Sequence, residues 1–305
     1  MAESTTIPSR LRTERLNTEG PFLDDLSASE MVSALLQSQA KAILALERAA
    51  TPLEAAVSAA HAILIRPQSR LIYCGAGTSG RLALLDAVEL GPTYNWPESR
   101  IEVLLAGGRS SLFQAQEGAE DDGEAARAAL CRLTPGANDV VVGLAASGTT
   151  PFVLAALAEA QSSGALTIGF SNNADTPLLA SVDFPILLET GEEALAGSTR
   201  LAAGTSQKIA LNIFSTSLMV LLGKAYRGRM VDMRVTNQKL QMRAVTMVAD
   251  LVGCGEAAAR EALEATYQDI KRAVLVAHGA SVIDADKALV ENGGVLKKAV
   301  RQLFE

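Results

Sequence analysis

Two short segments that combine glycine with hydroxyl side chains are the first candidates for chemistry. The sequence GAGTSG occupies residues 75–80, and SGTT occupies residues 147–150. Glycine lets the backbone approach an anion closely, and backbone N–H groups at the start of a helix bind phosphate without basic side chains. The two segments together could therefore hold one phosphate with little positive charge. The candidate phosphate contacts are Gly77, Thr78, Ser79, Ser147, Gly148 and Thr149.

Each segment also has a less specific interpretation. Ser and Thr at the junction of a strand and a helix are often only N-caps, and either segment alone fits that role as well. The first segment also matches the GxGxxG pattern of dinucleotide-binding proteins. That pattern requires an acidic residue at the end of the next strand, whereas Glu102 lies inside that strand. A dinucleotide would also leave the second segment unexplained, so the sequence favours a phosphate group.

Two carboxylates are candidates for acid–base catalysis. Glu120 comes just before a helical run, where the helix dipole favours an ionised carboxylate and hence a general base. Glu89 comes at the end of the helix after the first segment, where the dipole favours a protonated carboxyl and hence a general acid. The alternatives are a solvated helix start for Glu120 and an exposed last-turn residue for Glu89. His61 and His278 fall in helical stretches and are interpreted as core or surface residues.

Alternating strands and helices are expected to position these side chains. The alternation between residues 70 and 190 predicts a parallel sheet with helices on both faces, a three-layer αβα fold. Both glycine-containing segments follow predicted strands, at the edge where open α/β sheets bind ligands. Strands are predicted at 70–74, 101–106, 139–146, 166–171 and 184–188. Helices are predicted at 27–50, 53–65, 81–90, 110–133, 151–162, 198–224 and 239–251. The third is ended by Gly91 and Pro92, and the fourth has an acidic interruption.

The composition divides the chain into three predicted parts. Residues 1–25 form a polar N-terminal arm, and residues 26–250 form the α/β catalytic domain. Residues 251–305 have no strand signal and break into three short helical stretches at 279–280 and 293–294. The sequence therefore predicts a small helical C-terminal subdomain.

Charge and residue usage exclude several classes of function. The net charge is −7 without a dense run of Lys or Arg, so a nucleic-acid partner is not expected. The 3 Cys and 2 His residues lie far apart, so neither a metal site nor a disulfide framework is expected. The N-terminus is polar, and the longest apolar run, 209–222, falls short of the roughly 20 residues that cross a bilayer. We expect a cytoplasmic protein without membrane contact, cofactor or metal.

Taken in order, the motifs resemble the N-acetylmuramic acid 6-phosphate etherase family, which is related to the glucokinase regulatory protein within the sugar isomerase (SIS) superfamily. The resemblance covers nearly the whole chain. The matching stretches are TERLN at 13–17, GAGTSGRL at 75–82, LDAVE at 85–89, PTY at 92–94, EGAED at 117–121, ASGTTP at 146–151, GSTR at 197–200 and GTSQK at 204–208. Two positions differ, because the family usually has Lys where this chain has Ala202, and often has Cys-Pro-Pro where this chain has residues 90–92.

The resemblance implies a fold, a reaction and roles for particular residues. It implies an SIS-type sheet with a three-helix C-terminal segment similar to ubiquitin-associated domains. The family cleaves the D-lactyl ether at carbon 3 of the sugar phosphate, releasing D-lactate and N-acetylglucosamine 6-phosphate, in amino-sugar catabolism and peptidoglycan recycling. By resemblance, Glu120 removes the proton on carbon 2, Glu89 protonates the departing oxygen, and Ser198 joins the substrate-binding residues. No cofactor is implied.

Two other functions remain open within the same superfamily. A non-catalytic sugar-phosphate regulator would need the phosphate-binding segments alone, and an aldose–ketose isomerase would need no acid directed at carbon 3. The presence of both Glu89 and Glu120 favours the lyase over either alternative.

The spacing of Ser79 and Glu89 predicts a homodimer. Ten residues of helix separate their backbones by about 15 Å, whereas an extended sugar phosphate spans about 7 Å from phosphorus to carbon 2. A two-fold dimer in which each active site lies near the interface would bring the two residues to one substrate. The alternative is that side-chain reach or a bent helix closes the gap within one subunit.

Overall fold

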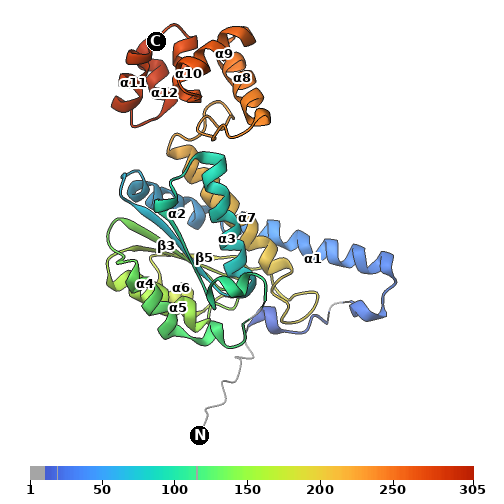
Figure 1. The fold of residues 1–305 in the computed structure, drawn as a ribbon. Helices are drawn as coiled ribbons and strands as arrows, with labels where there is room; N and C mark the ends of the chain where they lie inside the picture. Colours follow the sequence, from blue (N-terminus) through green and yellow to red (C-terminus); the bar gives the residue numbers. More distant parts are fainter. Residues whose placement is uncertain (1–10, 19, 115) are drawn as a thin grey trace. The chain divides into compact units, whose positions relative to one another are not determined.

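The computed structural model describes residues 11–18, 20–114 and 116–305, and Figure 1 traces them from blue to red. The chain divides into two compact units. One comprises Met1–Ala87 with Ser99–Phe214, and the other comprises Val88–Glu98 with Ser215–Glu305. Residues 1–10 of the predicted arm lie outside the described residues, and the predicted domain boundaries stay predictions.

The first unit is built on the predicted parallel sheet, which the structure confirms. Its five strands follow the order β2-β1-β3-β4-β5, and every neighbouring pair is parallel. Positions along the central strand β3 are all buried, which is typical of a parallel sheet covered on both faces. The strands are β1 (Arg70–Gly75), β2 (Ile101–Leu105), β3 (Asp139–Leu144), β4 (Leu166–Ser171) and β5 (Phe184–Leu187).

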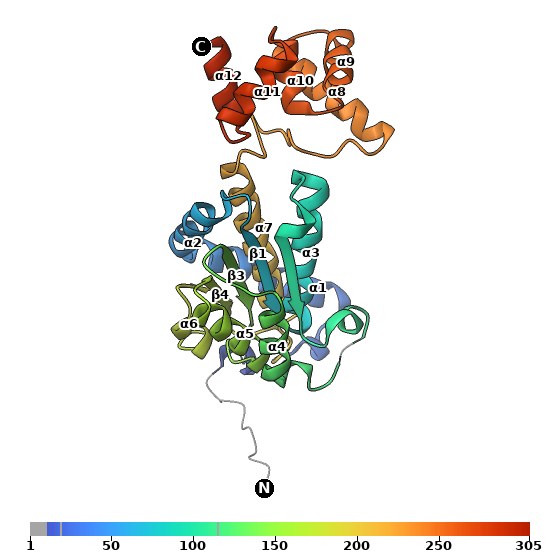
Figure 2. The same ribbon diagram turned by 60° about the vertical axis from the view of Figure 1, so that its left-hand side comes forward.

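Helices cover both faces of this sheet, which gives the three-layer fold (Figures 1 and 2). Ile72 and Val141 face the core that the sheet forms with α4 and α5. The next residue, Tyr73, points to the opposite face, where its hydroxyl donates to Asp86 of α3 over 2.8 Å. The helices with residues in this unit are α1 (Ala28–Arg48), α2 (Ala50–Leu64), α3 (Gly77–Tyr94), α4 (Gly123–Arg132), α5 (Pro151–Ser162), α6 (Pro177–Ser181) and α7 (Ala202–Leu221).

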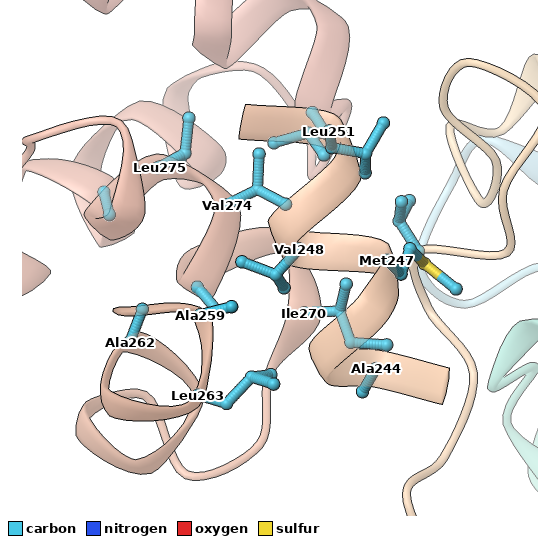
Figure 3. Packing of buried hydrophobic residues seen from close by; sticks show 14 of the residues in the cluster. Ala244, Met247, Val248, Leu251, Ala259, Ala262, Leu263, Ile270, Val274 and Leu275 are labelled. Atoms are coloured by element: carbon cyan, nitrogen blue, oxygen red, sulfur yellow. The ribbon is translucent and has the colours of Figure 1, made fainter. Parts of the chain in front are cut away.

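The second unit has a helical core of its own. Figure 3 shows Val248 of α8, Leu263 of α9 and Val274 of α10 packed together, and all three are almost fully buried. Full burial of such side chains typically stabilises a fold by about 1.5–3 kcal/mol each. The helices are α8 (Gln238–Val252), α9 (Glu256–Ala265), α10 (Ile270–Ala277), α11 (Val282–Glu291) and α12 (Leu296–Phe304).

The number of C-terminal helices differs from the sequence prediction. Three helical stretches were expected after residue 253, and the structure has four, α9 to α12. The additional break separates α9 from α10 at Tyr267 and Gln268, whose φ values are 52° and 66°. Positive φ is incompatible with a right-handed helix, and neither residue is a glycine that would have marked the turn in the sequence.

Two further helix predictions are wrong. The helix over 110–133, predicted with an acidic interruption, is confined to α4: only short 3-10 turns precede Gly123, and Gly118 between them adopts a positive φ. The helix that was expected to stop at Gly91 and Pro92 continues to Tyr94. Proline clashes mainly with the Cβ and N–H of the preceding residue, and Gly91 has no Cβ, so the helical backbone is retained there.

The structure also bears on membrane insertion. Among the described residues, no helix combines the length and the apolar character that crossing a membrane requires.

Candidate active site

The two glycine-containing segments meet at the point where the order of the sheet reverses. β1 and β3 are neighbours in the sheet, with Gly75 opposite Leu144 at their carboxyl ends. From β1 the chain continues to β2 on one side, and from β3 it continues to β4 on the other side. Open α/β sheets bind ligands in the crevice at such a switch point. The structure thus brings residues 75–80 and 147–150 to neighbouring strand ends, where a ligand is expected.

The first segment is the start of a helix rather than an extended loop. The carbonyl of Ala76 accepts from the N–H of Gly80 over 3.1 Å, so Ala76 is the N-cap and Thr78 and Ser79 lie in the first turn of α3. The N–H groups of a first helical turn have no acceptor within the helix. Ser79, which lies in this turn, is only 8% exposed. This turn has the features of an anion site.

A close contact between glycines fixes that turn against the strand. A Cβ on Gly75 would lie 2.7 Å from the Cα of Gly80, and a Cβ on Gly80 would lie 2.6 Å from the carbonyl oxygen of Gly75. Any larger residue at either position would push α3 away from β1. The two glycines therefore keep the first helical turn at the end of the strand.

The second segment forms a tight turn before α5. The Ser147 hydroxyl oxygen accepts from the N–H of Thr149 over 3.2 Å, and it lies 3.4 Å from the Thr150 hydroxyl. Thr150 is the N-cap residue of α5, but its side chain makes no capping hydrogen bond. Gly148 has a φ of 68°, and a Cβ there would lie 2.4 Å from the hydroxyl oxygen of Thr176. The turn therefore needs glycine at this position.

Sequence reasoning missed the residues that support this turn. Asn173 follows β4 and is 2% exposed. Its amide nitrogen donates to the carbonyl of Ala146 and to the hydroxyl of Thr13, both over 2.9 Å. Ala146 directly precedes Ser147, so Asn173 fixes the second segment to the N-terminal part of the chain. The only signal in the sequence was the polar pair 172–173 at the end of an apolar strand.

The predicted binding residue Ser198 lies in a segment that is hydrogen-bonded to Thr13, the partner of Asn173. The N–H of Gly197 donates to the carbonyl of Thr13 over 2.8 Å. Farther along, α7 lies beside the first segment, because a Cβ on Gly204 would be 3.3 Å from the methyl group of Thr78. Ser198 is half-buried between these two contacts.

A buried carboxylate fixes the start of α7. Glu193 is fully buried and accepts from the N–H groups of Ala202 and Ala203 over 3.0 and 2.8 Å. Burial raises the pKa of the Glu193 carboxyl, and the two N–H groups act in the opposite direction. The side chain of Ala202, where the family usually has Lys, is fully buried.

Glu120 is carried by a short turn near the start of α5. It is exposed in a 3-10 turn, Ala119–Asp121, two residues before Asp122, whose side chain caps α4. A Cβ on Gly123 would lie 3.5 Å from the carbonyl oxygen of Pro151, the first residue of α5. The turn that carries Glu120 is therefore next to the start of the helix that follows residues 147–150.

Glu89 is exposed on α3 and belongs to the second unit, because the boundary passes between Ala87 and Val88. Since α3 continues to Tyr94, Glu89 lies more than one turn before the end of the helix. The effect of a helix dipole falls off within the last turn, so the dipole gives no reason to place an acid at Glu89. Its assignment then depends on the resemblance of the motif alone.

A parallel sheet of this order, with two hydroxyl-rich turns at its switch point, defines a sugar-phosphate-binding domain of the SIS type. Comparison of families agrees, because residues 55–161 match the N-terminal SIS domain of glucokinase regulatory protein. Residues 227–292 match the C-terminal lid domain of that protein. The chain belongs to the N-acetylmuramic acid 6-phosphate etherase family.

Two relatives of that name show how complete the similarity is. The protein from Deinococcus radiodurans is 46% identical over 284 residues, which cover 93% of each chain. The protein from Serratia proteamaculans is 43% identical over 291 residues, which cover 95% of this chain and 98% of the relative. Among solved structures, phosphoheptose isomerase from Neisseria gonorrhoeae is 18% identical with a TM-score of 0.45, covering 64% of this chain and 98% of the isomerase.

Proposed function

We propose that this protein is a carbon–oxygen lyase that cleaves the D-lactyl ether of N-acetylmuramic acid 6-phosphate, giving N-acetylglucosamine 6-phosphate and D-lactate. The observation that carries the proposal is the similarity, over nearly the whole chain, to relatives named for this activity. The hydroxyl-rich turns at the switch point of the sheet support it. The test is to incubate the purified protein with N-acetylmuramic acid 6-phosphate and to measure D-lactate. Absence of D-lactate would exclude the proposal.

The reaction is an elimination followed by a hydration. Glu120 takes the proton from carbon 2 of the open-chain aldehyde, and the electron pair forms a double bond as the bond from carbon 3 to the lactyl oxygen breaks. Glu89 gives a proton to that oxygen, so D-lactate leaves. Water then adds its hydroxyl to carbon 3, and carbon 2 regains a proton.

The same residues distinguish the lyase from its two alternatives. A sugar-phosphate regulator requires the phosphate-binding turns but no carboxylate, and an isomerase requires the base but no acid at carbon 3. Release of D-lactate would exclude both, whereas exchange of the carbon 2 proton without D-lactate would favour the isomerase.

The phosphate group is held by Ser79 and Ser147. Replacing either residue with Ala removes a hydrogen bond to a charged group, worth roughly 1.5–3 kcal/mol, so we expect about 10- to 100-fold weaker binding of N-acetylglucosamine 6-phosphate. Titration calorimetry with the phosphorylated and unphosphorylated sugars measures this effect. Equal weakening for both sugars would contradict a phosphate contact.

The enzyme is a homodimer in the cytoplasm, with each active site completed near the interface. The spacing along α3 supports the dimer, because Ser79 and Glu89 lie ten residues apart, about 15 Å along a helix. The compartment follows from the substrate, because a charged sugar phosphate does not cross membranes unaided and is consumed where it is formed.

Mixed dimers test the shared site. Chains with Glu89→Gln are combined with chains carrying Ser79→Ala and Ser147→Ala, and at low substrate concentration each preparation alone is expected to have almost no activity. Half of the randomly mixed dimers would contain one intact site, so we expect about a quarter of the wild-type activity. No recovery after subunit exchange has been verified by mass spectrometry would contradict sharing.

A further inference from the structure

The N-terminal segment is anchored to the edge of the sheet that carries the two phosphate-binding turns. Thr13 is fully buried, although it lies close to the N-terminus. Its backbone N–H donates to the side-chain oxygen of Asn173 over 3.3 Å, and its hydroxyl accepts from the amide of the same residue over 2.9 Å. Its carbonyl accepts from the N–H of Gly197 over 2.8 Å. The backbone at residue 13 is thus fixed from two sides.

The residue next to this anchor carries an exposed carboxylate. Within the ranges that the structure describes, Glu14 takes part in no hydrogen bond or ion pair through its side chain. Its neighbour Arg12, in contrast, pairs with Glu189 over 2.8 Å and with Glu192 over 3.4 Å. Glu14 therefore contributes little to the fold through its charge, even though its backbone is held in a defined place.

Gly197 provides the space for this carboxylate. A Cβ on Gly197 would lie 2.9 Å from Oε2 of Glu14, so a larger residue would displace the carboxylate. The φ of Gly197 is 77°, which also favours glycine. The carboxylate thus lies against the backbone that leads directly into Ser198.

Asn173 connects this place to the phosphate-binding turns. The amide that holds Thr13 also donates to the carbonyl of Ala146, one residue before Ser147. Asn173 therefore binds both the residue before Glu14 and the residue before Ser147. The backbone that carries Glu14 thus lies near the backbone that leads into the second phosphate-binding turn.

We propose that Glu14 is a further substrate-binding residue, whose carboxylate accepts hydrogen bonds from the uncharged donors of the amino sugar. The substrate has two anionic groups, the 6-phosphate and the lactyl carboxylate, and both repel Glu14. The carboxylate therefore faces the hydroxyl groups and the acetamido N–H between them. This inference rests on the proposed function, and it goes beyond it by assigning a recognition site for the sugar itself.

Titration of Glu14 variants with two ligands tests this inference. We expect Glu14→Ala to weaken binding of N-acetylglucosamine 6-phosphate about 10- to 100-fold and Glu14→Gln to weaken it less, because the amide retains one acceptor. Binding of inorganic phosphate, which lacks the sugar, should stay at the wild-type level. The matched control is Glu54→Gln, at an exposed carboxylate on α2 that should leave both affinities unchanged.

The outcomes distinguish an incorrect role for Glu14 from an incorrect proposed function. Unchanged sugar binding in Glu14→Ala, or equal weakening of both ligands, would overturn the role of Glu14. A thermal unfolding midpoint equal to that of the wild type confirms that the variants are folded. Failure of the proposed function would appear in the wild-type chain itself, which would release no D-lactate and bind no product, and would overturn both inferences.

Discussion

Replacing Glu120 with Gln is expected to abolish exchange of the carbon 2 proton with solvent and to lower D-lactate release by about 10²–10⁴-fold. The amide has nearly the shape of the carboxylate but cannot accept the proton. Glu120 is exposed in its 3-10 turn, so the fold should not depend on its charge. Incubation in D₂O followed by mass spectrometry of the sugar measures the exchange.

A neighbouring carboxylate supplies the control for this experiment. Asp121 belongs to the same 3-10 turn and is also exposed, so Asp121→Asn removes a charge at nearly the same place. We expect it to retain exchange and activity close to the wild type. Wild-type exchange in Glu120→Gln, or an equal loss in both variants, would show that Glu120 is not the base.

Replacing Glu89 with Gln is expected to separate the two halves of the elimination. Departure of the lactyl oxygen should slow by about 10²–10⁴-fold, because no group protonates it. Removal of the carbon 2 proton by Glu120 should continue, so deuterium should still enter unreacted substrate. Measuring exchange and D-lactate in one incubation gives both quantities.

The control for Glu89 is Glu98→Gln, which removes another exposed carboxylate of the second unit. It should leave both quantities unchanged. If Glu89→Gln loses exchange together with lactate release, the residue does more than protonate the leaving group. If it loses neither, the acid lies elsewhere.

Much of the first unit could be predicted because its signals are local. The strand predicted at 166–171 has the same bounds as β4. An apolar run bounded by turn residues can be recognised as a strand from a few neighbouring residues. The positions of the two glycine-containing turns followed from the order of strands and helices. Placing them at a switch point required the order of the sheet, which the sequence alone did not contain.

The helix predictions failed where local signals competed with packing. Gly91 and Pro92 are both helix breakers by composition, yet α3 runs through them. Leu90 and Trp96 on either side are almost fully buried, at 2% and 1% exposure. Burial of these side chains favours the continuous helix. The local propensities of Gly91 and Pro92 do not include this packing free energy.

The supporting residues of the site could not be predicted for a different reason. Thr13 and Asn173 are ordinary polar residues in their own segments, and nothing in either segment identifies the other as a partner. Their side chains meet across 160 positions of sequence. Buried polar groups require partners, but the sequence does not say which residue provides one.

The same separation has a consequence for biosynthesis. Asn173 leaves the ribosome 160 residues after its partner Thr13. At about 5–20 residues per second, roughly 10 to 30 s pass before the N-terminal segment can dock. During that interval Leu11, which is 8% exposed in the folded protein, has no core to pack against. The segment around Thr13 therefore waits until residue 173 has been synthesised before its buried contacts can form.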